Sequence, residues 1–562
     1  MAIAIKKTAA IAIAAGLTFA GSAGVAAQDA LAQTTNTTAP TVATNVPDAS
    51  GIGEDDVKLT INKRVNPTEL RNATGETDAA PSGQPLAGVG FTAERLNVDI
   101  TNQSNFNEVA QFANNRNAAG AREKFGISAT TTLTDTDTNG QTSATLPVGA
   151  YIISEAKTPD AQGAEAYVPS EPFIVFLPMT NSEGTGWNRD VQVYPKNSYA
   201  KVTKTVTDES KNAQSNGEGT EGQPGFLGAR PAENAEVTYT LDGVVPAAPE
   251  NRVLNTLTLT DASNSAELQW DKTDNAFIEG VYVVRGGKEV EIDAKNYTVN
   301  SAADVPTTNT DGLAAGADQA FTVTVNAQDA GLKPGETVRV KVKATMLKDD
   351  TESKGIENSV RESFVFRNPS TGQDDTPKET PDDKVVTYVG DISVYKRGEV
   401  DGKENQPLAG AEFQIGKCNG DKSGLDGDAI QTGITDENGN LTFPGLHVTD
   451  WVNDAEPADT VANYCVVETK APEGYATPEG KAATKEITLT RTTTNALNTE
   501  KTAFEAVADS NEIANGAVVD NVKKTTPTLP ATGGMGILIV VLAGLAIIGG
   551  GVYAARRNSQ SA

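Results

Sequence analysis

This chain of 562 residues has very few of the residue types that most enzymes and metal sites need. It contains two cysteines, Cys418 and Cys465, and a single histidine, His447. No C-x-x-C or H-E-x-x-H spacing occurs, and the sequence offers no Gly-x-Ser-x-Gly element or Ser-His-Asp candidate. We therefore expect no metal, no cofactor and no enzymatic activity on an external substrate. His447 is interpreted as a surface or turn residue.

Positive charge is also scarce. The sequence has 46 basic and 74 acidic residues, which gives a formal net charge of −28. Binding of nucleic acid requires a basic patch or stripe that neutralises phosphates, and no cluster of Lys or Arg is present. The composition therefore excludes a nucleic-acid partner and fits the solvated surface of a secreted protein.

The first residues have the pattern of an export signal, in which two lysines precede an apolar run and small residues follow. This predicts a secretory signal peptide over residues 1–32, cleaved after Ala27 or after Ala32, and the pattern leaves both sites open. Residues 33–53 are rich in Thr, Ala and Pro and are predicted to form a flexible leader.

The C-terminal segment, residues 525–562, has a second targeting pattern. Its apolar run over 536–555 is long enough for one spanning helix, and the two arginines that follow fit the cytoplasmic side of a membrane. A simple membrane anchor is one interpretation. We prefer a cleavable acyl donor, because the run is preceded by Leu529, Pro530, Ala531, Thr532 and Gly533.

Between the two ends, short runs of alternating apolar and polar residues are separated by Gly, Asn and Asp turns. This pattern predicts an all-β fold of immunoglobulin-like β-sandwiches. QPLAGVGF at 84–91 returns as QPLAGAEF at 406–413, and TDTNG at 136–140 returns as TDENG at 435–439, so one supersecondary plan occurs twice. A helix or a long loop is expected over 106–125. We predict three tandem domains over residues 54–197, 198–370 and 384–524, with a polar linker over 371–383.

The stretch WNRDVQVYPKN, residues 187–197, predicts a β-strand at the end of the first domain. Val191, Val193 and Asn197 share one face of this strand, while Lys196 lies on the other. We therefore expect the amine of Lys196 to be offered outward, as the reaction partner of the acyl donor in another copy of the chain.

Each predicted domain also has a lysine on the apolar face of its first strand, an asparagine on that of its last strand, and a carboxylate on a middle strand. The triples are Lys63, Glu155 and Asn197; Lys204, Asp261 and Asn368; and Lys396, Glu468 and Asn521.

Burial of an ammonium and a carboxylate costs free energy unless they are paired or neutralised, and desolvation favours the neutral forms. A neutral amine is a nucleophile, and a protonated acid can polarise an asparagine carboxamide. Each triple therefore predicts an intramolecular Lys–Asn isopeptide bond, promoted by the acid and formed with loss of ammonia. Snorkelling lysines in ordinary salt bridges are the alternative, which stays most open in the first domain. In the second domain, strand parity alone favours Lys204 over Lys201.

These motifs together resemble the Spa-type backbone pilins of Gram-positive bacteria. WNRDVQVYPKN resembles their pilin motif, YCVVETKAPEGY at 464–475 resembles their E-box, and LPATG with the apolar run resembles their cell-wall sorting signal. The resemblance implies two CnaB-like domains flanking a CnaA-like domain. It also implies that a pilin-specific sortase cleaves after Thr532 and that Lys196 of the next subunit takes up the acyl group.

The resemblance further implies that a housekeeping sortase attaches the fibre to peptidoglycan, with accessory pilins as other partners, so that the protein forms a pilus on the cell surface. A wall-anchored adhesin or a minor pilin that binds a host ligand is the alternative function.

Cys418 and Cys465 both fall in the third domain, and outside the cell we expect them to form a disulfide.

Overall fold

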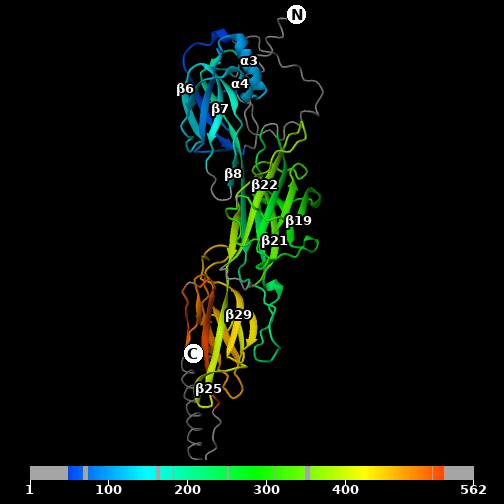
Figure 1. Cartoon of the computed structure of the whole chain (residues 1–562), viewed down its shortest axis with the longest axis vertical. Coiled ribbons are helices and arrows are strands. Elements are labelled where there is room, and N and C mark those ends of the chain that lie inside the picture. Colours follow the sequence, from blue (N-terminus) through cyan, green and yellow to red (C-terminus); the bar gives the residue numbers. More distant parts are fainter. Residues whose placement is uncertain are drawn as a thin grey trace, which may run out of the picture.

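The computed structural model describes residues 48–66, 74–159, 165–181, 183–249, 252–308, 310–347, 355–508 and 510–524. These residues form three β-rich bodies that follow one another along the long axis of the molecule (Figure 1). Each body has its own hydrophobic core, built mainly from residues 49–193, 200–385 and 392–519. The predicted all-β fold is confirmed.

The N domain places its core between a three-stranded sheet, in the order β12-β1-β6, and a four-stranded sheet, in the order β5-β4-β7-β9. Two helices in the predicted helix or loop region cover one side, where the rings of Phe106 and Phe176 lie 4.5 Å apart. The elements are β1 (Val57–Asn62), β2 (Arg64–Val65), β3 (Gln84–Pro85), β4 (Gly90–Leu96), α3 (Gln103–Asn114), α4 (Ala118–Phe125), β5 (Ile127–Thr132), β6 (Gln141–Leu146), β7 (Gly149–Lys157), β8 (Glu165–Val168), β9 (Phe173–Leu177), β10 (Met179–Thr180), β11 (Trp187–Asn188) and β12 (Asp190–Val193).

The middle domain is a sandwich of two antiparallel sheets. One sheet has the order β18-β17-β21-β14-β13 and the other has the order β19-β20-β15-β22. Its strands are β13 (Lys196–Thr207), β14 (Glu236–Val244), β15 (Val253–Ser263), β16 (Leu268–Gln269), β17 (Ile278–Arg285), β18 (Lys288–Glu291), β19 (Tyr297–Ala303), β20 (Gln319–Asn326), β21 (Thr337–Met346), β22 (Ile356–Arg367), β23 (Lys378–Glu379) and β24 (Asp383–Thr387).

The C domain pairs the sheet β26-β25-β29, to which β34 adds beside β25, with the sheet β28-β27-β30-β31. Its strands are β25 (Val389–Val400), β26 (Lys403–Pro407), β27 (Glu412–Lys417), β28 (Gln431–Ile434), β29 (Asn440–His447), β30 (Tyr464–Lys470), β31 (Thr484–Ile487), β32 (Asn495–Leu497), β33 (Phe504–Ala506) and β34 (Ala514–Asn521).

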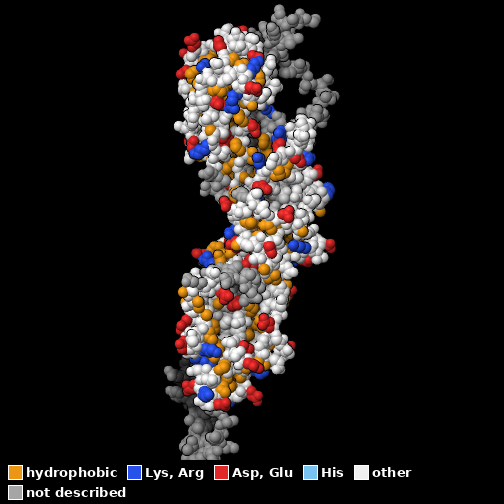
Figure 2. Space-filling view, in the orientation of Figure 1, with side chains coloured by type: hydrophobic (Ala, Val, Ile, Leu, Met, Phe, Trp, Pro, Cys, Tyr) orange, Lys and Arg blue, Asp and Glu red, His pale blue; other side chains and the backbone are white. Residues whose placement is uncertain are grey.

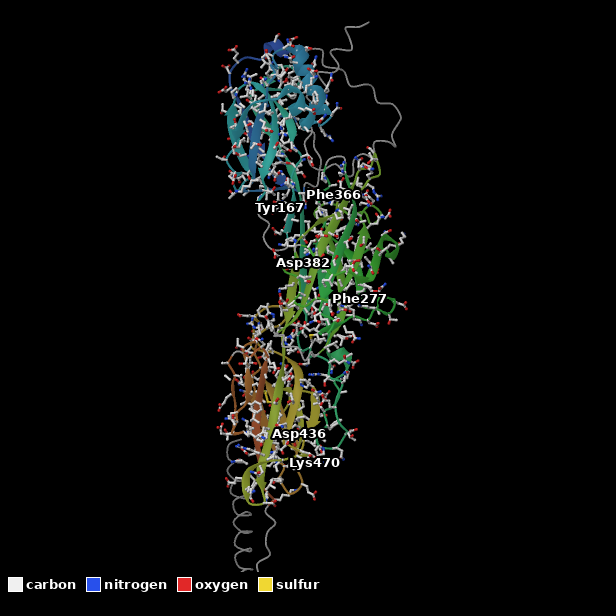
Figure 3. All side chains as sticks on the ribbon, in the orientation of Figure 1. Tyr167, Phe277, Phe366, Asp382, Asp436 and Lys470 are labelled. Carbon is white, nitrogen blue, oxygen red and sulfur yellow. A yellow bond between two sulfur atoms is a disulfide. The ribbon has the colours of Figure 1, made fainter. Side chains whose placement is uncertain are left out.

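The N and middle domains share the long strand β13. Its first residues pair with β2 and β8 of the N domain, and its later residues pair with β14. Tyr167, labelled in Figure 3, belongs to β8 at this junction and packs against Tyr199, with the tilted rings at a centroid distance of 5.2 Å. The chain thus passes from one domain to the next without a spacer.

The predicted linker over 371–383 does not separate the middle and C domains. Its residues lie along β22, with which β23 and β24 form antiparallel pairs. Asp382, labelled in Figure 3, is buried and accepts a 2.5 Å hydrogen bond from Arg361. These polar residues therefore form strand pairs with β22 and not a linker. The connection between the two domains is a single residue, Tyr388, between β24 and β25.

A segment of the middle domain, residues 210–231, reaches into the C domain. Leu227 belongs to the core of the C domain, and the neighbouring backbone pairs with the edge strand β28. Arg230 is buried and donates a hydrogen bond to the carbonyl of Pro444. The middle and C domains are therefore interlocked.

On the face shown in Figure 2, acidic and basic side chains are scattered along all three domains.

Residues 1–47 and 525–562 lie outside the described residues, and so do the predicted signal peptide, most of the leader, the LPATG element and the predicted span. Within the part of the chain that is described, no helix is both long and apolar enough to cross a membrane.

Candidate isopeptide sites

The two repeated motifs hold the lysine strand in the N and C domains. The backbone amide of Lys63 donates to Gly140 O, and that of Lys396 donates to Gly439 O, both at 2.7 Å. Gly140 and Gly439 have φ values of +73° and +76°, and a Cβ atom there would lie within 2.5 Å of the lysine carbonyl. Glycine is required for both reasons.

The same motifs close this contact from the other side. Leu86 and Leu408, from the two QPLAG elements, donate backbone hydrogen bonds to Lys63 O and Lys396 O, respectively. Asp436, labelled in Figure 3, accepts hydrogen bonds from two backbone amides of its own turn. The internal repeat therefore fixes the backbone of a buried lysine twice.

The N domain brings its predicted triple together. Lys63 Nζ donates to Glu155 Oε2 at 2.7 Å and to Asn197 Oδ1 at 2.5 Å, and Asn197 Nδ2 donates to Glu155 Oε1 at 2.9 Å. Lys63 is fully buried and Asn197 is 1% exposed. One carboxyl group thus bridges the amine nitrogen and the amide nitrogen, each on a different oxygen.

The C domain repeats this bridge. Glu468 Oε2 lies 3.3 Å from Lys396 Nζ, and Glu468 Oε1 accepts a 2.7 Å hydrogen bond from Asn521 Nδ2. Lys396 and Asn521 come from β25 and β34, which pair in parallel, as do β2 and β13 around Asn197. First and last strands are neighbours in both domains.

The middle domain requires a correction. Lys204 Nζ donates to Asp261 Oδ2, as predicted, but the asparagine beside this pair is Asn358, whose Nδ2 lies 3.4 Å from the same oxygen. Asn368 instead accepts hydrogen bonds from the amides of Ser370 and Thr371 in a turn after β22.

Strand direction explains this error. Asp261 lies near the end of β15, and β22 runs antiparallel to β15, so Asp261 stands opposite Val360 near the start of β22. Asn368 follows the opposite end of β22, although it shares parity with Asn358. Asn358 and Asn368 share one parity, and only the direction of β22 against β15 decides which of them lies beside Asp261.

Burial shifts the pKa values of the three lysines and of two of the acids in the direction that the chemistry needs. It lowers the pKa of Lys63 and of Lys396 to about 8, and it lowers the pKa of Lys204. Burial likewise raises the pKa values of Asp261 and Glu468 above their ordinary range. Loss of solvation therefore moves both members of the Lys204–Asp261 and Lys396–Glu468 pairs toward neutral amine and neutral acid, and it moves Lys63 toward the neutral amine.

The structure also separates Lys204 from Lys201. Lys204 is 5% exposed and faces Asp261, whereas the Lys201 side chain is 42% exposed and lies 3.3 Å from Glu165. Lys204 is the inward-facing lysine, as its parity predicted.

The expectation that Lys196 points into solvent is wrong. Lys196 is 8% exposed, and the two residues that follow it are buried as well. The predicted strand is interrupted at Tyr194 and Pro195, and β13 begins at Lys196 in the junction between two domains. Because both faces of β13 are covered there, alternation along one sheet does not place the side chain in solvent.

Cys418 and Cys465 form the predicted disulfide, across a sequence separation of 47 residues.

The interpretation of His447 as a surface residue is wrong. It is 3% exposed at the boundary with the middle domain, where its Nδ1 donates to Val448 O and its Nε2 lies 3.4 Å from Asp208 Oδ2. His447 is therefore buried by the interface between two domains, which the sequence pattern of its own strand does not predict.

Comparison with known proteins agrees with this architecture. Residues 54–198 match the family model of the Gram-positive pilin subunit D1, N-terminal domain, and residues 390–503 match a prealbumin-like fold domain. The chain is 26% identical to the type 1 fimbrial subunit of Actinomyces viscosus, over 98% of this chain and 97% of that protein. It is also 26% identical to the type 2 fimbrial subunit of Actinomyces naeslundii, over 87% of each.

Among solved structures, the full-length major pilin SpaD of Corynebacterium diphtheriae is similar, with a TM-score of 0.60 and 25% identity. The match covers 85% of this chain and all of SpaD. Fold and comparisons together define a pilus subunit. The pilin domain, the fimbrial relatives and the SpaD structure support a Spa-type pilin of Gram-positive bacteria, in agreement with the resemblance found in its motifs.

Proposed function

We propose that this pilin is the repeating shaft subunit of a covalent pilus, and that each of its three domains is closed by an internal Lys–Asn isopeptide bond. The observation that carries the internal bonds is the shared geometry of the three sites, in which a buried carboxyl group contacts both a lysine amine and an asparagine amide nitrogen. The pairs are Lys63–Asn197, Lys204–Asn358 and Lys396–Asn521.

In each site the neutral amine attacks the side-chain amide carbon, and the carboxyl group transfers protons. The carboxyl oxygen beside Nζ accepts the proton that the amine loses, and a carboxyl oxygen beside Nδ2 protonates the departing nitrogen. One amide bond forms, one C–N bond breaks and ammonia leaves, while the acid returns to its starting state. The acid is Glu155, Asp261 or Glu468.

The link between subunits uses the two ends of the chain. A pilin-specific sortase cleaves after Thr532, and Lys196 of the next subunit takes up the acyl group. Because Lys196 is 8% exposed, its amine becomes accessible when the start of β13 opens toward the enzyme. A housekeeping sortase then joins the finished fibre to peptidoglycan, with accessory pilins on the same fibre.

A pair of variants tests this assignment on cells that carry the sortases. Lys196→Ala should leave folding intact and abolish the high-mass ladder on denaturing gels. Lys201→Ala is the matched control, because Lys201 lies five residues along the same strand and is more exposed. A ladder that persists in Lys196→Ala, or one lost only in Lys201→Ala, would refute the assignment.

A further inference from the structure

A fourth residue contacts all three members of the N-domain triple. Ser170 lies in the connection between β8 and β9 and is 8% exposed. Its backbone amide donates to Asn197 Oδ1 at 2.8 Å. Its hydroxyl oxygen accepts a 3.1 Å hydrogen bond from Lys63 Nζ and lies 3.3 Å from Glu155 Oε2. Ser170 therefore contacts the nucleophile, the acid and the carbonyl that is attacked.

We propose that Ser170 is a catalytic residue of the N-domain cross-link, and that its backbone amide forms an oxyanion site for the tetrahedral intermediate. This inference rests on the proposed function of the Lys63–Asn197 pair. Attack of Lys63 Nζ on Asn197 Cγ moves negative charge onto Oδ1, the atom to which the Ser170 amide donates. A fixed donor at that position stabilises charge that develops only during the reaction.

The hydroxyl of Ser170 has a second, smaller role. It lies between Lys63 Nζ and Glu155 Oε2, so it orients the amine and offers a path for the proton that moves from Nζ to the carboxyl group. That proton then leaves with Asn197 Nδ2 as part of ammonia. No other reactant is needed, because the overall step exchanges one amide for another.

The other two domains lack this arrangement among their described residues. The C-domain turn ahead of β31 contains Ala482 and Ala483, and the Ala483 carbonyl accepts a hydrogen bond from the amide of Glu468. In the middle domain, Asn358 Oδ1 is buried without a hydrogen-bond partner among the residues described. The N domain, whose sequence lacks the full E-box form, thus has the extra donor.

The test follows cross-linking of the full secreted chain after a short pulse of expression, with peptide mapping of each domain over time. Ser170→Pro removes the amide hydrogen, and we expect N-domain cross-linking to slow by about 100-fold or more. Ser170→Ala keeps the amide and should slow it by less than about 10-fold. The C-domain cross-link in the same molecule is the internal control and should keep its rate.

A normal N-domain rate in Ser170→Pro would overturn the proposal, and so would a larger effect of Ser170→Ala. If the parent chain itself carries no N-domain cross-link, the proposed function of the pair fails, which is a different outcome. A second measurement does not need the proline variant to fold. In Glu155→Gln, hydrogen exchange at the Ser170 amide should be slow and should accelerate when Asn197→Ala is added. Fast exchange with Asn197 present would also overturn the proposal.

Discussion

The N and C domains hold their buried lysines with the same backbone contacts, yet they surround the reacting groups differently. The carbonyl of Gly140 accepts a hydrogen bond from the amide of Lys63, and the carbonyl of Gly439 accepts the equivalent bond from Lys396 at the same distance. Around Lys63, the carboxyl, the amide and a serine all lie within hydrogen-bond distance, whereas Lys396 Nζ contacts Glu468 and the carbonyl of Val519. The repeat motif thus fixes where a lysine is buried, and nearby loops decide how its partners are arranged.

The comparison also separates motif from site. The C domain has the fuller E-box sequence, and it supplies an acid that bridges two nitrogens. The N domain has the shorter AKTP form and supplies the same bridge. The bridge is therefore present with either sequence, because both place a carboxyl group opposite the buried lysine.

The largest effects should come from removal of the two acids, one at a time. We expect Glu155→Ala and Glu468→Ala each to restore the mass of one ammonia, within their own domain only. Each bond closes a long loop, of 134 residues in the N domain, so its loss should cost about 5 kcal/mol in the free energy of unfolding by chain entropy. The lysine left behind loses its buried partner, which adds to the cost.

Intact mass, peptide mapping and thermal unfolding of both variants measure this prediction. If one variant removed the cross-links of both domains, or if neither changed the mass, the two sites would not be independent reaction centres of the proposed kind.

The middle domain offers a matched pair of asparagines. Asn358→Ala should restore one ammonia, because it removes the amide that lies beside Asp261, and thermal unfolding of that domain should begin at a lower temperature. Asn368→Ala should leave the mass loss unchanged, since the Asn368 side chain accepts hydrogen bonds from the amides of Ser370 and Thr371 in an exposed turn, away from Asp261. The reverse result would restore the parity-based prediction and remove Asn358 from the site.

The sequence predicted the parts of this molecule that depend on local pattern. Alternation and turn residues gave the all-β fold, and the parity of Lys63, Glu155 and Asn197 was enough to bring three distant side chains together. Asn368 was wrong because parity repeats along a strand, so that only the direction of β22 against β15 distinguishes its two ends.

The remaining errors concern contacts that the pattern of one strand does not contain. His447 is buried against Asp208 of the middle domain, and Lys196 is buried where β13 begins at the junction of the N and middle domains. Residues 371–383 pair along a strand instead of spanning solvent. Ser170 was missed because it lies in a connection without periodicity. Its place between two prolines, at 169 and 172, was the one local sign of a fixed backbone.

The disulfide distinguishes the C domain from the N domain and should have an intermediate effect. Replacement of Cys418 and Cys465 together by alanine opens a loop of 47 residues, and we expect a loss of about 4 kcal/mol in the free energy of unfolding of the C domain. Thermal unfolding followed by a C-domain probe measures it. Mapping should show the Lys396–Asn521 cross-link unchanged, and a failure to cross-link would mean that the disulfide positions Glu468.

The smallest effect concerns the boundary of the middle and C domains, where Asp208 accepts hydrogen bonds from Thr387 and from the amide of Asn453 and faces His447. Burial alone would raise the pKa of Asp208, but these contacts together hold it below its ordinary value. A depressed pKa in the folded state means that this carboxylate stabilises the fold above about pH 4 and that the contribution is lost as the pH falls further.

Asp208→Asn should therefore cost about 1–3 kcal/mol in the free energy of unfolding at neutral pH, and the difference from the parent chain should shrink on acidification. Urea unfolding of both chains between about pH 3 and 7 measures it. A difference that grows toward low pH would show that Asp208 is not held as a carboxylate at this boundary.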